Sequence, residues 1–471
     1  MNNGSTWNRW ELHMHTPFTK KEDQFNILKD EKEKYTELKL KENPEYKYDQ
    51  FEHKWDKYIS KINNYVSNDS FERNIKVLGI TDYWSIDNYE HLVSIKNKLS
   101  SKIELILPNV ELRLSISGKK SPINIHCIFN PEIVDELHEV FFAQIKMKTG
   151  DDTYYATKKS FIRLGKKICK DKTRNDDDYE KIGIKNFTVE LSTLKTVFDN
   201  QRLRENTIIV VANSTNDGAS GLTGQLETVK KGLYHFVDAI FSATPSDIKY
   251  FSGKKSLKNV IDDCGKAMPC FHGSDAHSYE KIFEPDEKRY CYIKAELSFD
   301  GLKQVLNDPL DRVFIGKTSE ILENIEKTKS KKIKTLSINN SNTKTWFRNV
   351  CIEFNPQLNV IIGNKGNGKT AIGDILALCS NVPLTNDFKF LSQFSKTQDA
   401  QNIKSKITFF NEVSTEEIKL SEIPKPQTQK IKYIPQSFFE SITNEIDKTD
   451  KFRKEIEEVI FDYFPSAVRQ A

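Results

Sequence analysis

The chain has 471 residues, of which 37% are hydrophobic and 29% are charged, and its formal net charge is +4. This length fits two or three domains, and the composition is typical of a folded protein with a strongly hydrated surface. No apolar run approaches the roughly 20 residues that cross a bilayer, and the N-terminus lacks the apolar core of a signal peptide. We therefore expect a cytoplasmic protein without a membrane partner.

Cysteine usage and charge narrow the function classes further. The seven cysteines are scattered without a CxxC pair, which argues against a disulfide framework and against a cysteine-rich zinc site. The small positive charge is compatible with nucleic-acid binding, but a hydrated surface explains it equally well. Charge alone therefore does not identify a partner.

Short apolar runs that end in a polar residue recur through the first 316 residues. The runs are 10–15, 77–82, 103–111, 123–129, 207–214, 235–242 and 268–275. They are rich in β-branched residues, which is typical of buried strands, and helix-like stretches such as 86–100 and 256–266 separate most of them. Seven strand-and-crossover units predict a parallel barrel, whose active site lies where the strands end at their C-terminal edge.

Three segments depart from this repeat. Residues 20–58 are dense in Lys, Asp and Glu with interspersed aromatics, which predicts an inserted, charged helical excursion. Residues 137–205 form a second insertion, which we interpret as a cap over the barrel mouth. Residues 317–345 are Lys-rich and lack Gly and Pro, and we expect a linker there, before a second domain at 346–471.

Metal-ligand residue types collect at the predicted strand ends. His13 and His15 lie two apart on the first strand, so their side chains point to one face and can grip a divalent metal. By itself such a pair is more often two ordinary surface histidines. The further candidates on later strands are Asp82, Glu111, His126, Asp275 and His277. Imidazoles and carboxylates together suit Mn, Zn or Fe, and two bridged metals can position a hydroxide for phosphoester displacement.

The order HxH, TD-aromatic, Glu, His and GSDAH resembles the PHP (polymerase and histidinol phosphatase) superfamily over residues 10–316. The resemblance implies a distorted (β/α)7 barrel that hydrolyses phosphoesters with two or three metals. One metal would be held by His13, His15, Glu111 and Asp275. A second would be held by Glu111 and His126, with Asn213 or another strand-end group. Catalysis would rest on Glu111, His126 and Asp275.

This chain departs from the family pattern at the third metal position. Tyr83 stands where the family has the histidine of its TDH motif, and only Asp23 offers the ligand expected soon after HxH. His277 would otherwise share that third position. We therefore expect about two metals, and a degenerate barrel kept as a scaffold is the alternative.

The second predicted domain carries a phosphate-binding loop. Residues 363–370, GNKGNGKT, match GxxxxGK[ST], follow predicted strands at 351–356 and 358–363, and open a helix. The loop residues are Gly363, Asn364, Lys365, Gly366, Asn367, Gly368, Lys369 and Thr370. Its backbone N–H groups would cradle the phosphates of ATP, with Lys369 at the β/γ-phosphates and Thr370 on Mg²⁺.

The flanks of this loop, residues 354–379, resemble the N-terminal part of SMC-like (ABC-type) ATPase heads. By that resemblance, Gln436 in KYIPQ occupies the Q-loop position that senses Mg²⁺ and the γ-phosphate. After residue 370 we find no LSGG-like signature and no apolar strand ending in Asp-Glu. The resemblance therefore covers only part of a head.

Taken together, the chain is expected to be an α/β protein, a PHP barrel followed by a partial P-loop ATPase domain. This pairing resembles PHP–ATPase proteins of bacterial antiviral defence, including the TrlF-like group. The resemblance implies a nuclease acting on DNA or RNA, regulated by ATP, in antiphage defence and as a homo-oligomer. Two alternatives remain open: a nucleotide phosphomonoesterase, and a non-catalytic nucleic-acid-binding ATPase module with a dead barrel.

Overall fold

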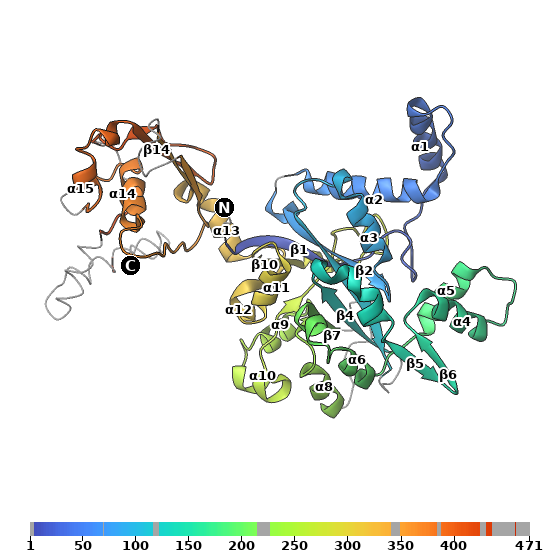
Figure 1. Ribbon diagram of the computed structural model, residues 1–471. Coiled ribbons are helices and arrows are strands. Elements are labelled where there is room, and N and C mark those ends of the chain that lie inside the picture. The colour runs from blue at the N-terminus through green and yellow to red at the C-terminus, as the bar shows by residue number, and fades with distance from the viewer. Residues whose placement is uncertain are drawn as a thin grey trace. The chain divides into compact units, whose positions relative to one another are not determined.

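The computed structural model describes residues 4–68, 70–115, 122–213, 227–340, 349–383, 388–423, 430–435 and 457. The chain divides into two compact units, which we name the barrel unit (Gly4–Ser319) and the C-terminal unit (Glu320–Ala471) (Figure 1). Within the described ranges, no helix is both long and apolar enough to cross a membrane.

The barrel unit is built on a nine-stranded sheet in the order β11-β10-β1-β2-β3-β4-β7-β8-β9. Its strands are β1 (Thr6–Met14), β2 (Ile75–Tyr83), β3 (Leu105–Leu114), β4 (Ile123–Phe129), β7 (Thr207–Ala212), β8 (Ala239–Phe241), β9 (Cys270–Phe271), β10 (Tyr290–Ala295) and β11 (Val313–Gly316). All seven predicted runs contain a strand, although β8 and β9 are shorter than expected.

The sheet is mixed, whereas the sequence pattern predicted parallel strands throughout. Strands β1, β2 and β3 run parallel, as do β7, β8 and β9, but β4 is antiparallel to both of its neighbours. Residues 115–122, which join β3 to β4, are too few for a crossover connection, which takes about a dozen residues or more. The chain therefore turns back directly, and His126 reaches the site through strand register rather than from a strand end.

The sheet nearly closes on itself at the end of β1. Met14 forms a parallel bridge with Ala276, which lies beyond β9. The His15 N–H donates to the Ala276 carbonyl at 3.2 Å, and the Asp275 N–H donates to the His13 carbonyl at 2.8 Å. These contacts make the sheet barrel-like and bring the GSDAH segment beside HxH.

The two faces of the sheet have different roles. The face that carries Glu111 and His126 has an apolar floor that includes Leu107, Ile128 and Ile208. The opposite face packs against helices in a second, larger apolar cluster. Burial of both faces holds the strands rigidly, because interiors pack as densely as organic crystals. The ligand residues thus stand above a packed floor.

Helices cover the sheet and supply two excursions (Figure 1). The helices are α1 (Lys29–Glu42), α2 (Gln50–Val66), α3 (Asp87–Ser94), α4 (Lys158–Ile168), α5 (Asp176–Asn186), α6 (Leu191–Val197), α7 (Gln201–Glu205), α8 (Glu227–Tyr234), α9 (Pro245–Phe251), α10 (Leu257–Cys264), α11 (Phe299–Val305) and α12 (Pro309–Arg312). The expected stretches at 86–100 and 256–266 contain α3 and α10.

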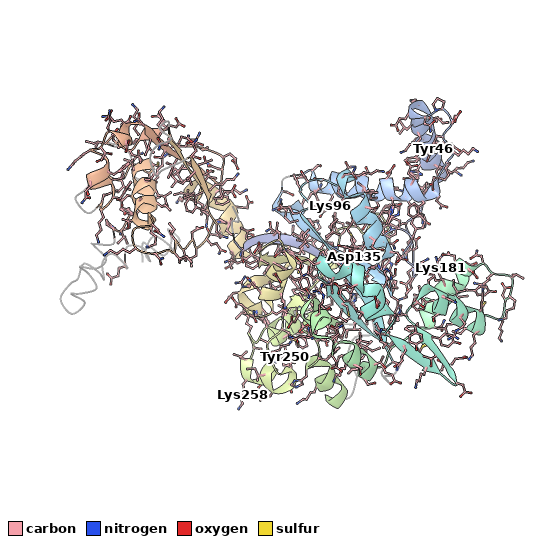
Figure 2. All side chains as sticks on the ribbon, in the orientation of Figure 1. Tyr46, Lys96, Asp135, Lys181, Tyr250 and Lys258 are labelled. Atoms are coloured by element: carbon pink, nitrogen blue, oxygen red, sulfur yellow. The ribbon has the colours of Figure 1, made fainter. Side chains whose placement is uncertain are left out.

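The first excursion is the predicted charged helical segment. Helix α1 buries none of its residues, whereas α2 buries Trp55, Tyr58 and Ile62 in the larger core cluster. Figure 2 shows Tyr46 near the end of this arm, in the connection between the two helices. The arm is therefore anchored in the core through α2, and α1 lies along α2 through contacts such as the stacking of Tyr35 on His53 at 3.9 Å.

The second excursion, between β4 and β7, contains the hairpin β5 (Lys146–Thr149) and β6 (Asp152–Tyr155) and the paired helices α4 and α5. A Cβ at Gly165 would lie 1.9 Å from the Tyr179 carbonyl oxygen, so this helix crossing requires glycine. Lys20, in the loop that follows HxH, forms ion pairs with Asp177 at 3.2 Å and Glu180 at 3.1 Å. Helix α5 is thereby tied to the loop beside the site, and a role of the insertion as a cap stays a prediction.

The C-terminal unit contains a four-stranded antiparallel sheet in the order β13-β12-β14-β15. Its elements are α13 (Glu320–Lys327), β12 (Ile333–Asn340), β13 (Val350–Glu353), α14 (Lys369–Cys379), α15 (Leu391–Phe394), β14 (Ile403–Phe409) and β15 (Ile418–Lys419). Helix α14 packs Ile375 and Leu378 into one apolar cluster with Leu336 and Ile407 of the sheet.

Two expectations for this region differ from the structure. Residues 317–345 do not form only a linker, because they include α13 and the central strand β12. Leu336 and Ile338 are buried and lie two residues apart, as expected for one face of a strand. The many lysines around them obscured this strand pattern in the sequence. The strand expected at 358–363 is not formed, and Leu358 and Ile362 are 81% and 87% exposed. A strand needs a neighbour for its backbone hydrogen bonds, and none of the described strands pairs with it.

Candidate metal centre

The end of β1 supplies two of the ligand-type side chains. His13 and His15 are both buried, and their ring centroids lie 5.4 Å apart. The Nε2 atoms of His13 and His15 lie 3.1 and 3.3 Å from the same oxygen, Oδ1 of Asp275. The predicted shared direction of the HxH pair is therefore observed.

The β3–β4 pairing supplies the next two side chains. Glu111 lies directly opposite His126 in the antiparallel register. Glu111 Oε2 is 3.8 Å from His13 Nε2 and 3.6 Å from His15 Nε2, and the rings of His13 and His126 are 4.6 Å apart. Two overlapping groups result, each with ligand atoms within 4.8 Å of one another: His13, Glu111 and His126, and His13, His15 and Asp275.

Asp275 is positioned by a tight turn after β9. Its φ is +47°, a left-handed conformation that non-glycine residues seldom adopt. A Cβ at Gly273 would lie 2.5 Å from the His13 backbone nitrogen, so only glycine permits this approach to β1. Glu11 Oε1 accepts a hydrogen bond from the Ser274 N–H at 2.6 Å. The turn is thus held on β1 by backbone and side-chain contacts.

Burial sets the protonation states of the cluster. It lowers the pKa of His15 to about 4 and that of His126 to about 3, so both imidazoles are neutral near pH 7. Burial raises the pKa of Glu111, but hydrogen bonding to His13 and the surrounding histidines outweigh this and lower it to about 2. Burial likewise opposes ionisation of Asp275, and His13, His15 and His277 reverse this, so that its pKa lies well below the usual value.

Two asparagines that sequence reasoning missed orient the ligands. Asn109 donates through Nδ2 to the Leu12 carbonyl and to Thr81 Oγ1, both at 3.0 Å, so its Oδ1 is the acceptor that faces His126 Nδ1 at 3.2 Å. This assigns the proton of His126 to Nδ1 and leaves the lone pair on Nε2, as a metal ligand requires.

Asn124 acts in the same way on the carboxylate. Its Nδ2 donates to Glu111 Oε1 at 2.5 Å, while Oε2 faces the histidines. The period of two along a strand was the signal available for both asparagines. Asn109 and Glu111 lie two apart on β3, and Asn124 and His126 lie two apart on β4.

Asp82 is not brought into the cluster. Tyr83 lies opposite Glu111 in the β2–β3 register, so Asp82, one residue earlier, faces the other way. Its Oδ1 accepts from the Asn88 side chain at 2.7 Å and its Oδ2 from the Asn88 N–H at 3.1 Å, at the start of α3. Burial raises the pKa of Asp82 to about 7, although these hydrogen bonds oppose that rise. Asp82 therefore holds the start of α3 against β2.

Tyr83 and His277, the residues that the family resemblance relates to a third metal, both stack on His15. The Tyr83 ring stacks on the His15 ring at 4.9 Å, and the His277 ring does so at 4.1 Å. His277 Nε2 is 3.5 Å from Asp275 Oδ1, so His277 borders the cluster. Burial raises the pKa of Tyr83 well above its usual value, so the phenol is protonated at neutral pH.

Asn213 is engaged elsewhere. Its Nδ2 donates to Asp247 Oδ2 and its Oδ1 accepts from the Tyr234 hydroxyl, both at 2.9 Å. The remaining donor set fits a divalent cation, because neutral imidazole nitrogens and ionised carboxylate oxygens converge in a buried space without a cationic side chain among them. The part of the chain that the structure describes thus contains buried His, Glu and Asp groups suited to a metal ion.

The phosphate loop of the C-terminal unit has a different setting. Residues 363–368 precede α14, with Gly366 and Gly368 at φ of +89° and +83°, which favour glycine. Lys369 Nζ donates to the carbonyls of Gly363 at 2.8 Å and Asn364 at 2.9 Å. The lysine therefore folds back over its own loop, while Thr370 lies in the first turn of the helix.

The segment that precedes Gln436 lies against α14. The Tyr433 hydroxyl donates to Asp374 of this helix, and the Tyr433 ring packs on Phe388 at 5.0 Å. Gln436 itself lies outside the described residues. Its predicted Q-loop position therefore stays a prediction.

Comparisons with known proteins show little similarity. No family model matches the chain, and no curated protein matches it. One similar solved structure is PsfC from Pseudomonas syringae PB-5123, with a TM-score of 0.33 and 11% sequence identity, covering 70% of this chain and 97% of PsfC. A similarity at this level supports no inference about fold or function, so the proposals below rest on the residues of this chain.

Proposed function

We propose that the barrel unit is a metal-dependent phosphoesterase that cleaves phosphodiesters in DNA or RNA. The observation that carries this proposal is the convergence of four buried side chains, His13, His15, Glu111 and His126, with the half-buried Asp275, above an apolar floor. Such a set suits Mn, Zn or Fe, and the five side chains with their shared carboxylate support about two ions. When bound, these metals supply Lewis acidity and an activated hydroxide.

The residues of the chain contribute binding and orientation. His13, His15 and Asp275 would hold one metal with Glu111, and Glu111 and His126 would hold the second. Asn109 keeps His126 in the tautomer whose Nε2 lone pair faces the site, and Asn124 holds Glu111 by one oxygen. Burial keeps the His15 and His126 imidazoles neutral and strengthens charge interactions in the site.

We further propose that the C-terminal unit binds ATP with Mg²⁺ through Gly363–Thr370 and regulates the barrel. The loop, its positive-φ glycines and the helix that begins at Lys369 support binding of phosphates. ATP-dependent gating, a homo-oligomeric state and a role in antiphage defence remain part of this proposal, and they rest on the resemblance of the domain pairing.

The test is hydrolysis of a defined substrate panel by the full chain reconstituted with Mn²⁺. Single-stranded DNA, duplex DNA, RNA and nucleoside monophosphates are offered with and without chelator. We expect metal-dependent cleavage of at least one nucleic acid, with kcat lowered by about 10²-fold or more in Glu111→Gln. Cleavage that persists with chelator, or a Glu111→Gln variant with wild-type kcat, would contradict the proposal.

Two other functions give different results on the same panel. A nucleotide phosphomonoesterase releases phosphate from the monophosphates and leaves internal phosphodiesters intact. A non-catalytic module binds nucleic acid and ATP but releases no product with any metal. The orientation of both ligand side chains by Asn109 and Asn124 favours a functional centre over a decayed one, because a scaffold does not need such partners.

A further inference from the structure

A cavity of about 470 Å³ opens beside the metal cluster. Asp275 and His277 form one side, and the segment that joins GSDAH to β10 forms the other with Lys281, Asp286, Glu287 and Arg289. The volume lies within the roughly 300–1,000 Å³ typical of small-ligand sites. The cavity is therefore continuous with the metal site, and it has room for a part of a substrate that does not contact the metals.

Two cations line this cavity, and each holds an exposed carboxylate. Lys281 Nζ lies 3.1 Å from Asp286 Oδ1, and Arg289 pairs with Glu287. The Asp286 and Glu287 side chains are 83% and 72% exposed, whereas the Arg289 side chain is only 29% exposed. Arg289 also donates through Nη1 to the Ala243 carbonyl at 3.3 Å, which fixes its guanidinium at the cavity wall.

These ion pairs are exchangeable. Pairs with such exposed carboxylates contribute only about 0–1 kcal/mol, and Asp286 and Glu287 can rotate into water at little cost. An incoming phosphate offers Arg289 a bidentate, charge-assisted partner in their place. Lys281 and Arg289 thus form an anion-binding site, in which an anionic ligand can easily displace the carboxylates of Asp286 and Glu287.

The backbone of the cavity wall has an unusual, enforced shape. Phe283, Glu287 and Lys288 all have positive φ, at +65°, +56° and +54°, and none is glycine. The Phe283 carbonyl accepts a 2.5 Å hydrogen bond from the buried guanidinium of Arg9. Such conformations cost about 1–2 kcal/mol each and persist where surrounding contacts impose them. Surrounding contacts thus hold the backbone of the segment that carries Lys281 and Arg289.

We propose that this cavity binds a second phosphate of the substrate, the neighbour of the phosphate at the metals on the same nucleic-acid strand. The inference rests on the proposed phosphodiesterase function and deepens it. It predicts selectivity for substrates with two adjacent phosphates over those with one. Arg289 is the specificity-determining residue, and Lys281 assists it.

The experiment compares three dinucleotides of one base sequence on the Mn²⁺-loaded full chain: NpN with one phosphate, pNpN with an added 5′-phosphate, and NpNp with an added 3′-phosphate. We expect kcat/KM for one of the two-phosphate substrates to exceed that of NpN by about tenfold or more, mostly through KM. Which one is preferred reports the strand polarity. Equal values for all three would overturn the proposal.

Variants assign the preference to the cavity. Arg289→Met should remove it and leave hydrolysis of NpN within about twofold, while Glu287→Gln should lower KM for the preferred substrate by freeing the guanidinium. Lys288→Met is the matched control, because Lys288 is the neighbouring cation, is exposed and does not line the cavity. Equal losses on all substrates in Arg289→Met would mean a structural role and contradict the proposal.

A binding measurement separates this inference from the proposed function. The same dinucleotides are titrated calorimetrically into the Mn²⁺-loaded wild type and Arg289→Met. If no phosphodiester is cleaved, yet a two-phosphate ligand binds more tightly and Arg289→Met abolishes that difference, the cavity assignment holds and the catalytic proposal fails. If affinity is the same with one phosphate or two, the cavity assignment is overturned whatever the activity.

Discussion

The two candidate sites of this chain are built in opposite ways. In the barrel unit, the ligand side chains stand on paired, buried strands, and asparagines hold Glu111 and His126 in place. In the C-terminal unit, the phosphate loop is exposed, Lys369 contacts only carbonyls of its own loop, and no described strand pairs with the apolar segment 358–362. The side chains of the metal site are therefore held by neighbouring strands and asparagines, whereas Lys369 of the phosphate loop is held by carbonyls of the loop itself.

The largest expected effect comes from Glu111, which is proposed to face both metals. Glu111→Gln should lower kcat for a phosphodiester by about 10²-fold or more and reduce metal content, because the amide keeps the shape but loses the charge. His277→Ala, at the edge of the cluster, should lower kcat less. Steady-state kinetics and elemental analysis measure both.

Asp82→Asn is the matched control for that variant, since it makes the same chemical change to a buried carboxyl that caps α3. It should keep its metal and its activity. Loss of metal in Asp82→Asn, or a larger loss of kcat in His277→Ala than in Glu111→Gln, would show that the third metal position is filled.

Ligand orientation can be tested without touching a ligand. Asn109→Ala removes the acceptor that fixes the His126 tautomer, and such partners typically contribute about 10–100-fold in metal affinity. Competition against a chelator of known affinity gives the change for Mn²⁺. Unchanged affinity would mean that the barrel strands alone position His126, and it would contradict the proposed role of Asn109 in orienting this ligand.

The phosphate loop should respond to a single lysine. Lys369→Ala removes a charged donor to the phosphates, which is worth roughly 10–100-fold in ATP affinity. The purified chain should bind ATP with near-background turnover, because no signature motif follows residue 370. Equilibrium binding and phosphate release test this. Robust turnover that Lys369→Ala abolishes would refute it.

The smallest expected effect is a pH dependence of stability in the metal-free protein. Burial lowers the folded-state pKa of His126 to about 3 from a usual value near 6.5, so below pH 6.5 the unfolded chain takes up a proton that the folded chain refuses. The free energy of unfolding therefore falls as pH falls from 6.5 toward 3. The slope per proton is at most about 1.4 kcal/mol per pH unit.

Other buried groups titrate in the same range, so the comparison must be between variants. Burial lowers the pKa of His272 to about 4 and adds to the trend, while burial raises the pKa of Glu11 to about 7 and opposes it. Thermal unfolding of wild type and His126→Gln with chelator at pH 7, 6 and 5 isolates one residue. We expect a shallower loss of Tm in the variant. Parallel curves would contradict the assigned burial.

The sequence predicted the metal cluster better than the strands that carry it. HxH and GSDAH are local patterns, and their residues meet because β1 bridges to Ala276. A motif match does not specify which of two adjacent strand residues faces the site. The β2–β3 register places Tyr83 on the same face as Glu111, so Asp82 lies outside the cluster. The reversal of β4 depends on the short connection between β3 and β4. The apolar runs did not show where each strand ends, so they did not show how short this connection is.

The strands of the C-terminal unit were harder to predict from the sequence, for a physical reason. Apolar segment 358–362 has a strong strand pattern, but pairing is decided by neighbours, and the described sheet does not include it. Conversely, Leu336 and Ile338 lie in Lys-rich sequence and still form a buried strand, because tertiary packing on α14 overrides composition. Local pattern identified the phosphate loop itself, and the sheet around it needed the three-dimensional partners.

The most direct test of the central claim is the metal content of the full chain. The protein is stripped with chelator, reconstituted with Mn²⁺ and passed through a desalting column, and the bound metal is then measured per chain together with Tm. We expect about two ions per chain, a higher Tm than that of the stripped protein, and loss of both properties in a His13→Ala, Asp275→Ala double variant. No bound metal, and a Tm that reconstitution does not change, would contradict it.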